Sequence, residues 1–325
     1  MRLLKRILLG LLLLLLISGL GGYIYFKTAF KPAPNQLTLL HSEASIPFFW
    51  QGDTINHELN SYAAMLLPAS LNGCPQTFYM QFDLGAPTSI FYKNKLDAIN
   101  KRYHNLSFQQ QADNVQLKNY QFTLAGSQVN AKSIAVKEID SSGIAWTDIT
   151  TKQIIGTIGT DMFESKVLVI DYQKNKLFIG DKIPASLSTR AHLINFKFES
   201  RRVLLPAVLN GEEVDIFFDS GTSAFELMTD KKTWERLAKK GAKVDRYSAR
   251  SWSNELTVTT APTDYPIRFN TTEIPLQHVT YVEGTSFFQR LLMKLGGVGG
   301  LTGNILFVGK IVILDTKNKK FDIIE

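Results

Sequence analysis

Cysteine is almost absent from this chain of 325 residues, which contains only Cys74. A single thiol cannot form an intrachain disulfide, and it cannot build a cysteine-based zinc site. The five histidines are scattered and show no His-Glu-x-x-His or similar spacing. The sequence therefore predicts no metal site.

Outside the N-terminus the sequence has little excess of positive over negative charge. The formal net charge is +7, but residues 1–31 contribute five of these charges and contain no acidic residue. The remainder is close to neutral, so we expect no nucleic-acid partner.

Two further sequence motifs are missing. No Gly-x-Ser-x-Gly marks a serine hydrolase, and the glycine-rich stretch GGVGGLTG (296–303) lacks the Lys-Ser/Thr of a phosphate loop.

The N-terminus has the longest apolar run. Residues 7–26 are uncharged and predominantly apolar, and they follow the basic segment MRLLKR. Twenty such residues match the thickness of a bilayer, and basic residues before the run place that end in the cytoplasm. We expect a single-pass transmembrane anchor within 1–31, with the body periplasmic, extracellular or lumenal. A cleaved signal peptide, with Gly19 and Gly21 at the small-residue positions, is the alternative.

An internal repeat organises the rest of the chain. LLPASLNG (66–73) and LLPAVLNG (204–211) match at seven of eight positions, and each is followed by Phe-Asp-x-Gly. The second copy reaches its Asp two residues sooner. A third block, starting at Gly159 and again at Gly303, matches over 21 positions without a gap. Blocks that recur in one order indicate a tandem duplication. We expect a first half at 32–190 and a second half at 191–325.

Both halves read as mainly β. Each Asn-Gly pair predicts a type I′ hairpin turn, and the return strands TFYMQF and VDIFF each deliver an Asp at the strand end. The third block predicts strand, polar turn, strand. We expect a helix in TDKKTWERLAKKG (229–241), capped by Thr229 or Asp230 and stopped by Gly241. Shorter helices are expected in 92–103 and 285–297.

The candidate chemistry comes from the two repeated aspartates, Asp83 and Asp219. If the halves pack about a pseudo-twofold axis, the two turns meet and the carboxyl groups converge. Two carboxylates about 3 Å apart cannot both ionise, so such a pair shares one proton. The ionised member can activate a water, and the protonated member can polarise a carbonyl.

With FDLGAPTS (82–89), FFDSGTS (217–223) and the segments TIG (157–159) and LTG (301–303), the chain resembles the pepsin/retropepsin superfamily of aspartic proteases. The resemblance implies a two-lobed, mainly β fold and hydrolysis of peptide or protein substrates without a cofactor. It implies that Asp83 and Asp219 are catalytic. The residues expected to support this dyad are Gly85, Ser220, Gly221, Thr222, Gly159 and Gly303. The oligomeric state stays open.

One position departs from the family pattern. The family places Thr or Ser directly after each Asp, where the two hydroxyls brace the opposed loops; Ser220 fits, but Leu84 does not. We expect the missing hydroxyl to leave Ser220 without its symmetric partner. Two alternatives to an active endopeptidase therefore stay open. One is a pseudoprotease that binds peptides or a protein partner in the same cleft, and the other is a structural envelope protein.

Overall fold

The computed structural model describes residues 32–56, 58–104, 109–111, 114–139, 142–148, 150–251, 254–284 and 298–325. The chain divides into the units Met1–Pro34 and Asn35–Glu325. The expected anchor at 7–26 and the helix expected in 285–297 lie outside the described residues. Within the described ranges, no helix combines the length and apolar character needed to cross a bilayer.

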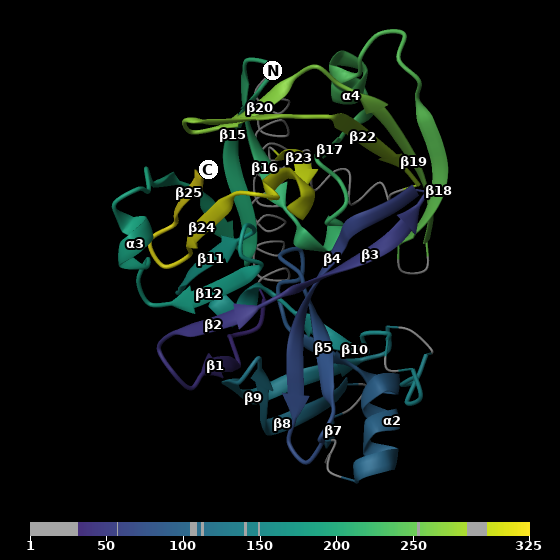
Figure 1. The fold of residues 1–325 in the computed structure, drawn as a ribbon, viewed down its shortest axis with the longest axis vertical. Coiled ribbons are helices and arrows are strands. Elements are labelled where there is room, and N and C mark those ends of the chain that lie inside the picture. The colour runs from purple at the N-terminus through teal and green to yellow at the C-terminus, as the bar shows by residue number, and fades with distance from the viewer. Residues whose placement is uncertain are drawn as a thin grey trace, which may run out of the picture. The chain divides into compact units, whose positions relative to one another are not determined.

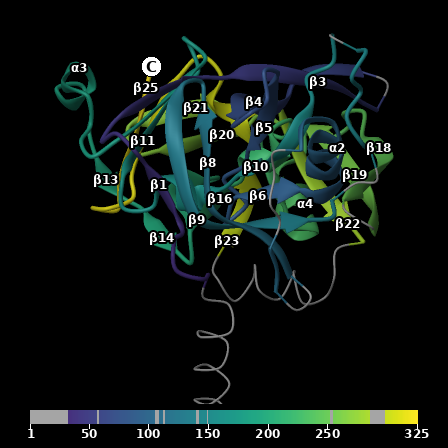
Figure 2. The same ribbon diagram turned by 90° about the horizontal axis from the view of Figure 1, so that it is seen from below.

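The unit Asn35–Glu325 is mainly β, as the sequence predicts, and its described strands form three sheets (Figures 1 and 2). The first is built from the first half, in the order β1-β9-β6-β10-β5-β4-β8-β7 with β3 on β4. Its strands are β1 (Leu37–Leu39), β3 (Phe49–Ile55), β4 (Glu58–Leu71), β5 (Thr77–Phe82), β6 (Ile90–Tyr92), β7 (Gln109–Gln111), β8 (Asn114–Leu124), β9 (Ser127–Lys137) and β10 (Ile154–Ile158).

A second sheet belongs to the second half, in the order β18-β19-β22-β17-β23-β16-β15-β20-β21 with β14 on β15. The burial of β15 shows why it forms: every second side chain is buried, as expected for a strand with one face on a core. The strands are β14 (Lys197–Glu199), β15 (Arg202–Leu209), β16 (Glu212–Phe218), β17 (Met228–Thr229), β18 (Asp245–Ser251), β19 (Asn254–Pro262), β20 (Pro266–Phe269), β21 (Thr272–Pro275), β22 (His278–Glu283) and β23 (Val298–Thr302).

The third sheet joins the two halves in the order β13-β25-β24-β11-β12-β2. At its centre β11 and β24 run antiparallel, with Val169 opposite Ile313, so the repeated third blocks pair with each other. Both strands are apolar because both faces are covered; helix α3 and its neighbours cover the outer face. The strands are β2 (Ala44–Pro47), β11 (Val167–Asp171), β12 (Lys176–Gly180), β13 (Ile194–Asn195), β24 (Ile311–Asp315) and β25 (Lys320–Ile324).

The described helices are few and short. The expected helix in 92–103 is confirmed as α2. The cap of α4 is Asp230, whose side chain accepts from the N–H groups of Lys232 and Thr233. This helix stops before Gly241, because Ala238 already forms a β-bridge to Thr263. The helices are α2 (Lys93–Tyr103), α3 (Ala185–Ser188) and α4 (Lys231–Leu237), with 3-10 turns η1 (Thr160–Phe163), η2 (Ser220–Thr222) and η3 (Asn304–Phe307).

The two Asn-Gly turns differ. Asn210 and Gly211 both have positive φ, at 50° and 77°, and they join paired residues Leu209 and Glu212 in the expected two-residue turn. The prediction for Asn72-Gly73 is wrong. There only the glycine has positive φ, and the ladder resumes at Thr77. The two extra residues of the first copy lengthen this turn.

Candidate active site

Asp83 and Asp219 occupy equivalent places at the ends of two buried strands. In each half the strand before the Asp pairs in parallel with the strand that ends in the second glycine motif: β5 with β10, and β16 with β23. The Asp83 N–H donates to Ile158 O at 3.0 Å, and the Asp219 N–H donates to Thr302 O at 2.9 Å. The duplication thus delivers two carboxyl groups from two equivalent strand ends.

The two Asp loops meet face to face. Each carboxyl accepts a hydrogen bond from the glycine two residues on, Gly85 at 2.8 Å and Gly221 at 2.9 Å. Each glycine also lies against the opposite carboxyl. A Cβ on Gly85 would lie 2.4 Å from Asp219 Oδ1, and one on Gly221 would lie 2.7 Å from Asp83 Oδ1. Only residues without a side chain fit here, so the geometry itself requires both glycines.

Gly159 and Gly303 each lie against the backbone of one Asp loop. A Cβ on Gly159 would lie 2.5 Å from Ala86 O, and one on Gly303 would lie 2.2 Å from Thr222 O. These glycines therefore permit the close approach of a second backbone segment to each Asp loop. Thr222 stabilises its own loop, because its hydroxyl donates to Asp219 O at 2.9 Å.

The hydroxyl of Ser220 binds the backbone of the opposite loop, although Leu84 offers it no symmetric hydroxyl partner. This fully buried hydroxyl accepts from the Leu84 N–H at 2.8 Å and donates to Phe82 O at 3.1 Å. Position 84 offers no symmetric hydroxyl, and the bonds of Ser220 go to the backbone of the opposite loop. Leu84 itself is fully buried in the apolar core.

Sequence reasoning missed a second set of polar residues behind the loops. Asn304, directly after Gly303, donates to Ser220 O at 3.1 Å and to Ser223 Oγ at 2.9 Å. Tyr172 of the first half donates its hydroxyl to Asn304 Oδ1 at 2.7 Å. In the first half the carboxyl of Asp161 takes a similar place and accepts from Ser89. The available signal for Asn304 and Asp161 was their position one and two residues after the repeated glycines.

The electrostatics of the pair favour a shared proton. Burial raises the pKa of Asp83, and burial followed by the negative charge of Asp83 raises the pKa of Asp219. The two carboxyls are within hydrogen-bonding reach of each other. A pair coupled in this way titrates as a unit.

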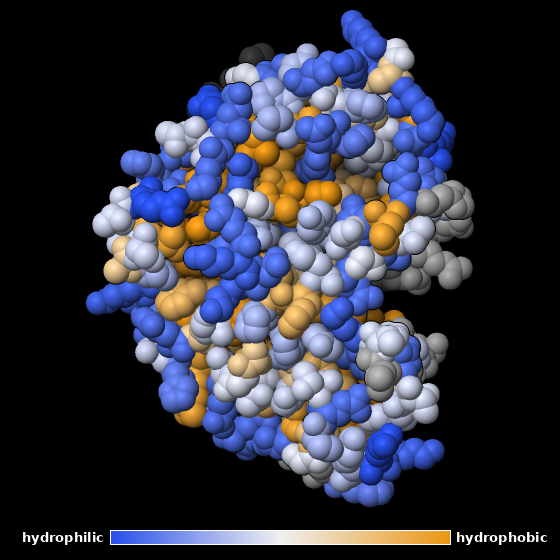
Figure 3. Space-filling view, viewed as in Figure 1, coloured by the Kyte–Doolittle hydropathy of each residue, from blue (hydrophilic) through white to orange (hydrophobic). Residues whose placement is uncertain are grey.

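The surface of the molecule is hollowed at one edge. The space-filling view shows a notch at the right edge, between the regions of β18 and α2 (Figure 3).

Comparison with known proteins gives a likeness of fold. No protein-family model matches the sequence, and no curated protein matches it. In three dimensions the chain is similar to the crystal structure of an aspartic proteinase from Irpex lacteus, with a TM-score of 0.47 and 12% identity. The match covers 87% of this chain and 97% of the other.

The glycine contacts give a first prediction. Gly85→Ala should destabilise the protein by about 1–3 kcal/mol, because the new methyl group collides with the Asp219 carboxyl. In an Asp219→Ala background the same change should cost clearly less, since the colliding atoms are gone. Urea unfolding of the wild type, the two single variants and the double variant measures this coupling. Equal costs in both backgrounds would show that the loops do not meet in this way.

The raised pKa values give a second prediction. A carboxyl whose folded pKa exceeds its unfolded value makes stability fall as pH rises between the two. Asp219→Asn removes this titration and should therefore be more stable than the wild type at pH 7. We expect a difference of at least about 1 kcal/mol, because a tenfold change in proton affinity corresponds to about 1.4 kcal/mol. The difference should shrink toward zero near the ordinary pKa of an aspartate, about 4.

A matched control has the opposite sign. The pKa of Asp181 is lowered by its ion pair with Lys166, so Asp181→Asn should lose stability at neutral pH. Thermal unfolding of the three proteins from mildly acidic to neutral pH checks both trends. A wild type and an Asp219→Asn variant that run parallel over this range would contradict the raised pKa.

Proposed function

We propose that this protein is an aspartic endopeptidase with Asp83 and Asp219 as its catalytic dyad. The observation that carries the proposal is the reciprocal contact of the two loops, in which each glycine lies against the carboxyl of the other half. Two carboxyls that face each other across a pseudo-twofold axis, with raised pKa values, form the acid–base pair that amide hydrolysis needs.

The residues divide the chemistry as follows. The ionised member of the dyad takes a proton from a water that attacks the scissile carbonyl. The protonated member donates a hydrogen bond to that carbonyl and later protonates the leaving amine. The Gly85 and Gly221 N–H groups hold the carboxyls in orientation, and Ser220 holds the two loops together. The C–O bond to the water oxygen forms and the C–N bond breaks; the proton taken from water replaces the one given to the amine, so no cofactor is needed.

A second candidate function is a pseudoprotease that binds peptides in the same place. The observation that favours it is Leu84, which is fully buried where the family pattern has a hydroxyl. Both functions would use the Asp83 and Asp219 loops, so only turnover separates them.

A third prediction follows from the proposed dyad. Replacing either Asp83 or Asp219 with Asn should reduce cleavage of a peptide library by at least about a thousandfold, because the mechanism needs one carboxylate and one carboxylic acid. Asn keeps the acceptor for the Gly85 or Gly221 N–H, so the fold should persist. The measurement is turnover by the full-length chain in detergent, with and without pepstatin.

Three outcomes are distinguishable. Pepstatin-sensitive cleavage that both variants lose supports the endopeptidase. Near-full turnover in both variants would show that the dyad is assigned wrongly. Saturable peptide binding by a wild type that never cleaves would favour the pseudoprotease. Asp181→Asn is the matched control, since this exposed carboxyl pairs with Lys166 outside the dyad.

We further propose that residues 7–26 anchor the chain, that the N-terminus is cytoplasmic, and that halves 32–190 and 191–325 face the other side of the membrane. The support is the uncharged run and the basic residues that precede it.

A fourth prediction is that full-length protein sediments with membranes and stays there after carbonate extraction. Protease added from outside should degrade residues 32–325 once any outer membrane or cell wall has been made permeable. A soluble mature form beginning near Gly22 would instead indicate a cleaved signal.

A further inference from the structure

Arg201 is an unusual residue for a hairpin turn. It lies between β14 and β15, where Ser200 and Arg201 both have positive φ, at 50° and 61°. Such turns favour Gly, Asn and Asp, and a bulky residue in this conformation costs free energy. Arg201 is nevertheless only 4% exposed. A strained, buried arginine in a turn is a feature that the surrounding structure must hold in place.

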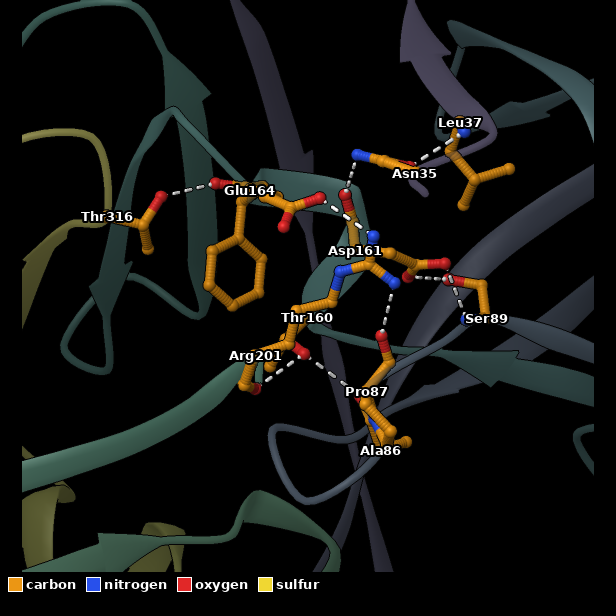
Figure 4. Close-up of polar contacts among 11 residues, drawn as sticks. Asn35, Leu37, Ala86, Pro87, Ser89, Thr160, Asp161, Glu164, Arg201 and Thr316 are labelled. Carbon is orange, nitrogen blue, oxygen red and sulfur yellow. Dashed lines mark hydrogen bonds and ion pairs between the residues drawn. The ribbon is translucent and has the colours of Figure 1, made fainter. Parts of the chain in front are cut away.

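The polar contacts of Arg201 reach into the first half (Figure 4). Its guanidinium donates to Glu164 Oε2 at 2.8 Å and to Pro87 O at 3.3 Å. Its carbonyl accepts from the Thr160 hydroxyl at 2.8 Å. Pro87 belongs to the loop that starts at Asp83. A turn of the second half therefore lies directly behind the Asp83 loop.

The back of that loop is held by the same cluster. Ala86 O accepts from the N–H of Thr160 at 2.9 Å and from its hydroxyl at 3.2 Å. Ser89 donates to the Asp161 carboxyl through its N–H at 2.8 Å and through its hydroxyl at 2.7 Å. Burial raises the pKa of Asp161, while the Ser89 bonds and the Arg201 charge act in the opposite direction. Arg201 thus pairs with Glu164 and places its positive charge near the buried carboxyl of Asp161.

The second half has an analogous arrangement. Behind the Asp219 loop, Asn304 binds Ser220 O and Ser223 Oγ, and Tyr172 of the first half binds Asn304. The Asp83 loop is therefore contacted directly by Arg201 of the opposite half, whereas Tyr172 reaches the Asp219 loop through Asn304. At the front, the hydroxyl of Ser220 bridges the loops.

We propose that Arg201 is a positioning residue for the reaction: it holds the Ala86-Pro87 turn so that the Gly85 N–H stays on Asp83. The inference rests on the proposed dyad, which Arg201 does not touch. Asp219 is the charged side chain that faces Asp83, and Arg201 is not in contact with either carboxyl. Arg201 therefore acts on the dyad only through the Ala86-Pro87 turn. A misplacement of about 1 Å in a catalytic group can cost on the order of a hundredfold in rate.

The test compares Arg201→Met and Thr160→Val with the wild type, all as full-length chains in detergent. Thr160→Val keeps the shape and the arginine, but removes the hydroxyl that binds Arg201 O and Ala86 O. The control is Arg236→Met, which removes an exposed ion pair with Glu212 at 2.9 Å. Amide hydrogen exchange is followed separately in peptides covering residues 84–89 and 220–225.

We expect exchange at residues 84–89 to accelerate at least about tenfold in both variants, with little change at 220–225 and none in the control. Where the wild type cleaves peptides, kcat should fall at least about tenfold while KM stays within about twofold. The acid limb of the pH profile should move to higher pH, because Asp83 loses its Gly85 bond.

The exchange readout does not depend on activity, so an inactive wild type would count against the proposed function and leave this inference decidable. Unchanged exchange at 84–89 in both variants would overturn it. Equal acceleration in both loops would also overturn it, since that is what a merely structural residue produces. If Arg201→Met does not fold, Glu164→Gln, which keeps the arginine and removes the negative charge that it pairs with, is compared in its place.

Discussion

The site depends on one steric constraint: two glycines lie where no side chain fits. Gly85 and Gly221 each press against the carboxyl of the opposite half, and a Cβ on either would overlap it. This contact brings Asp83 and Asp219 close enough to share a proton, and it buries them enough to raise the pKa of both. The chemistry proposed for the pair is a consequence of how closely two backbones approach.

Such an approach must be held by something larger than two loops. The central sheet provides this support, because β11 and β24 pair across the halves with Val169 opposite Ile313. Just beyond these strands, the Tyr172 N–H donates to Lys310 O and the Thr316 N–H donates to Lys166 O, at 3.0 and 2.9 Å. These reciprocal bonds repeat the pseudo-twofold relation of the dyad at a distance. The same symmetry therefore operates at the core and at the site.

The sequence predicts the features that repeat and misses those that do not. The duplication identified the Asp loops, the threading glycines and the strand blocks, because each appears twice in one order. The longer turn after Leu71 depends on a difference between the copies, and the type I′ turn expected at Asn72-Gly73 is wrong. The backbone bonds of Ser220 were likewise not contained in the repeat. Arg201 carried no signal, since a turn residue acquires its role only when the halves pack. Contacts between distant segments are the part that local patterns do not contain.

Leu84 shows how such an asymmetry can be tolerated. A typical net hydrogen bond contributes about 1 kcal/mol, whereas burying a leucine side chain contributes about 1.5–3 kcal/mol. Leu84 is fully buried, and Ser220 alone already binds both the N–H of Leu84 and the carbonyl of Phe82. Replacing the second hydroxyl by an apolar contact therefore need not loosen the loops. Because the carboxyls are oriented by Gly85 and Gly221 rather than by the residue at position 84, the departure changes how the halves adhere and leaves the geometry of the dyad intact.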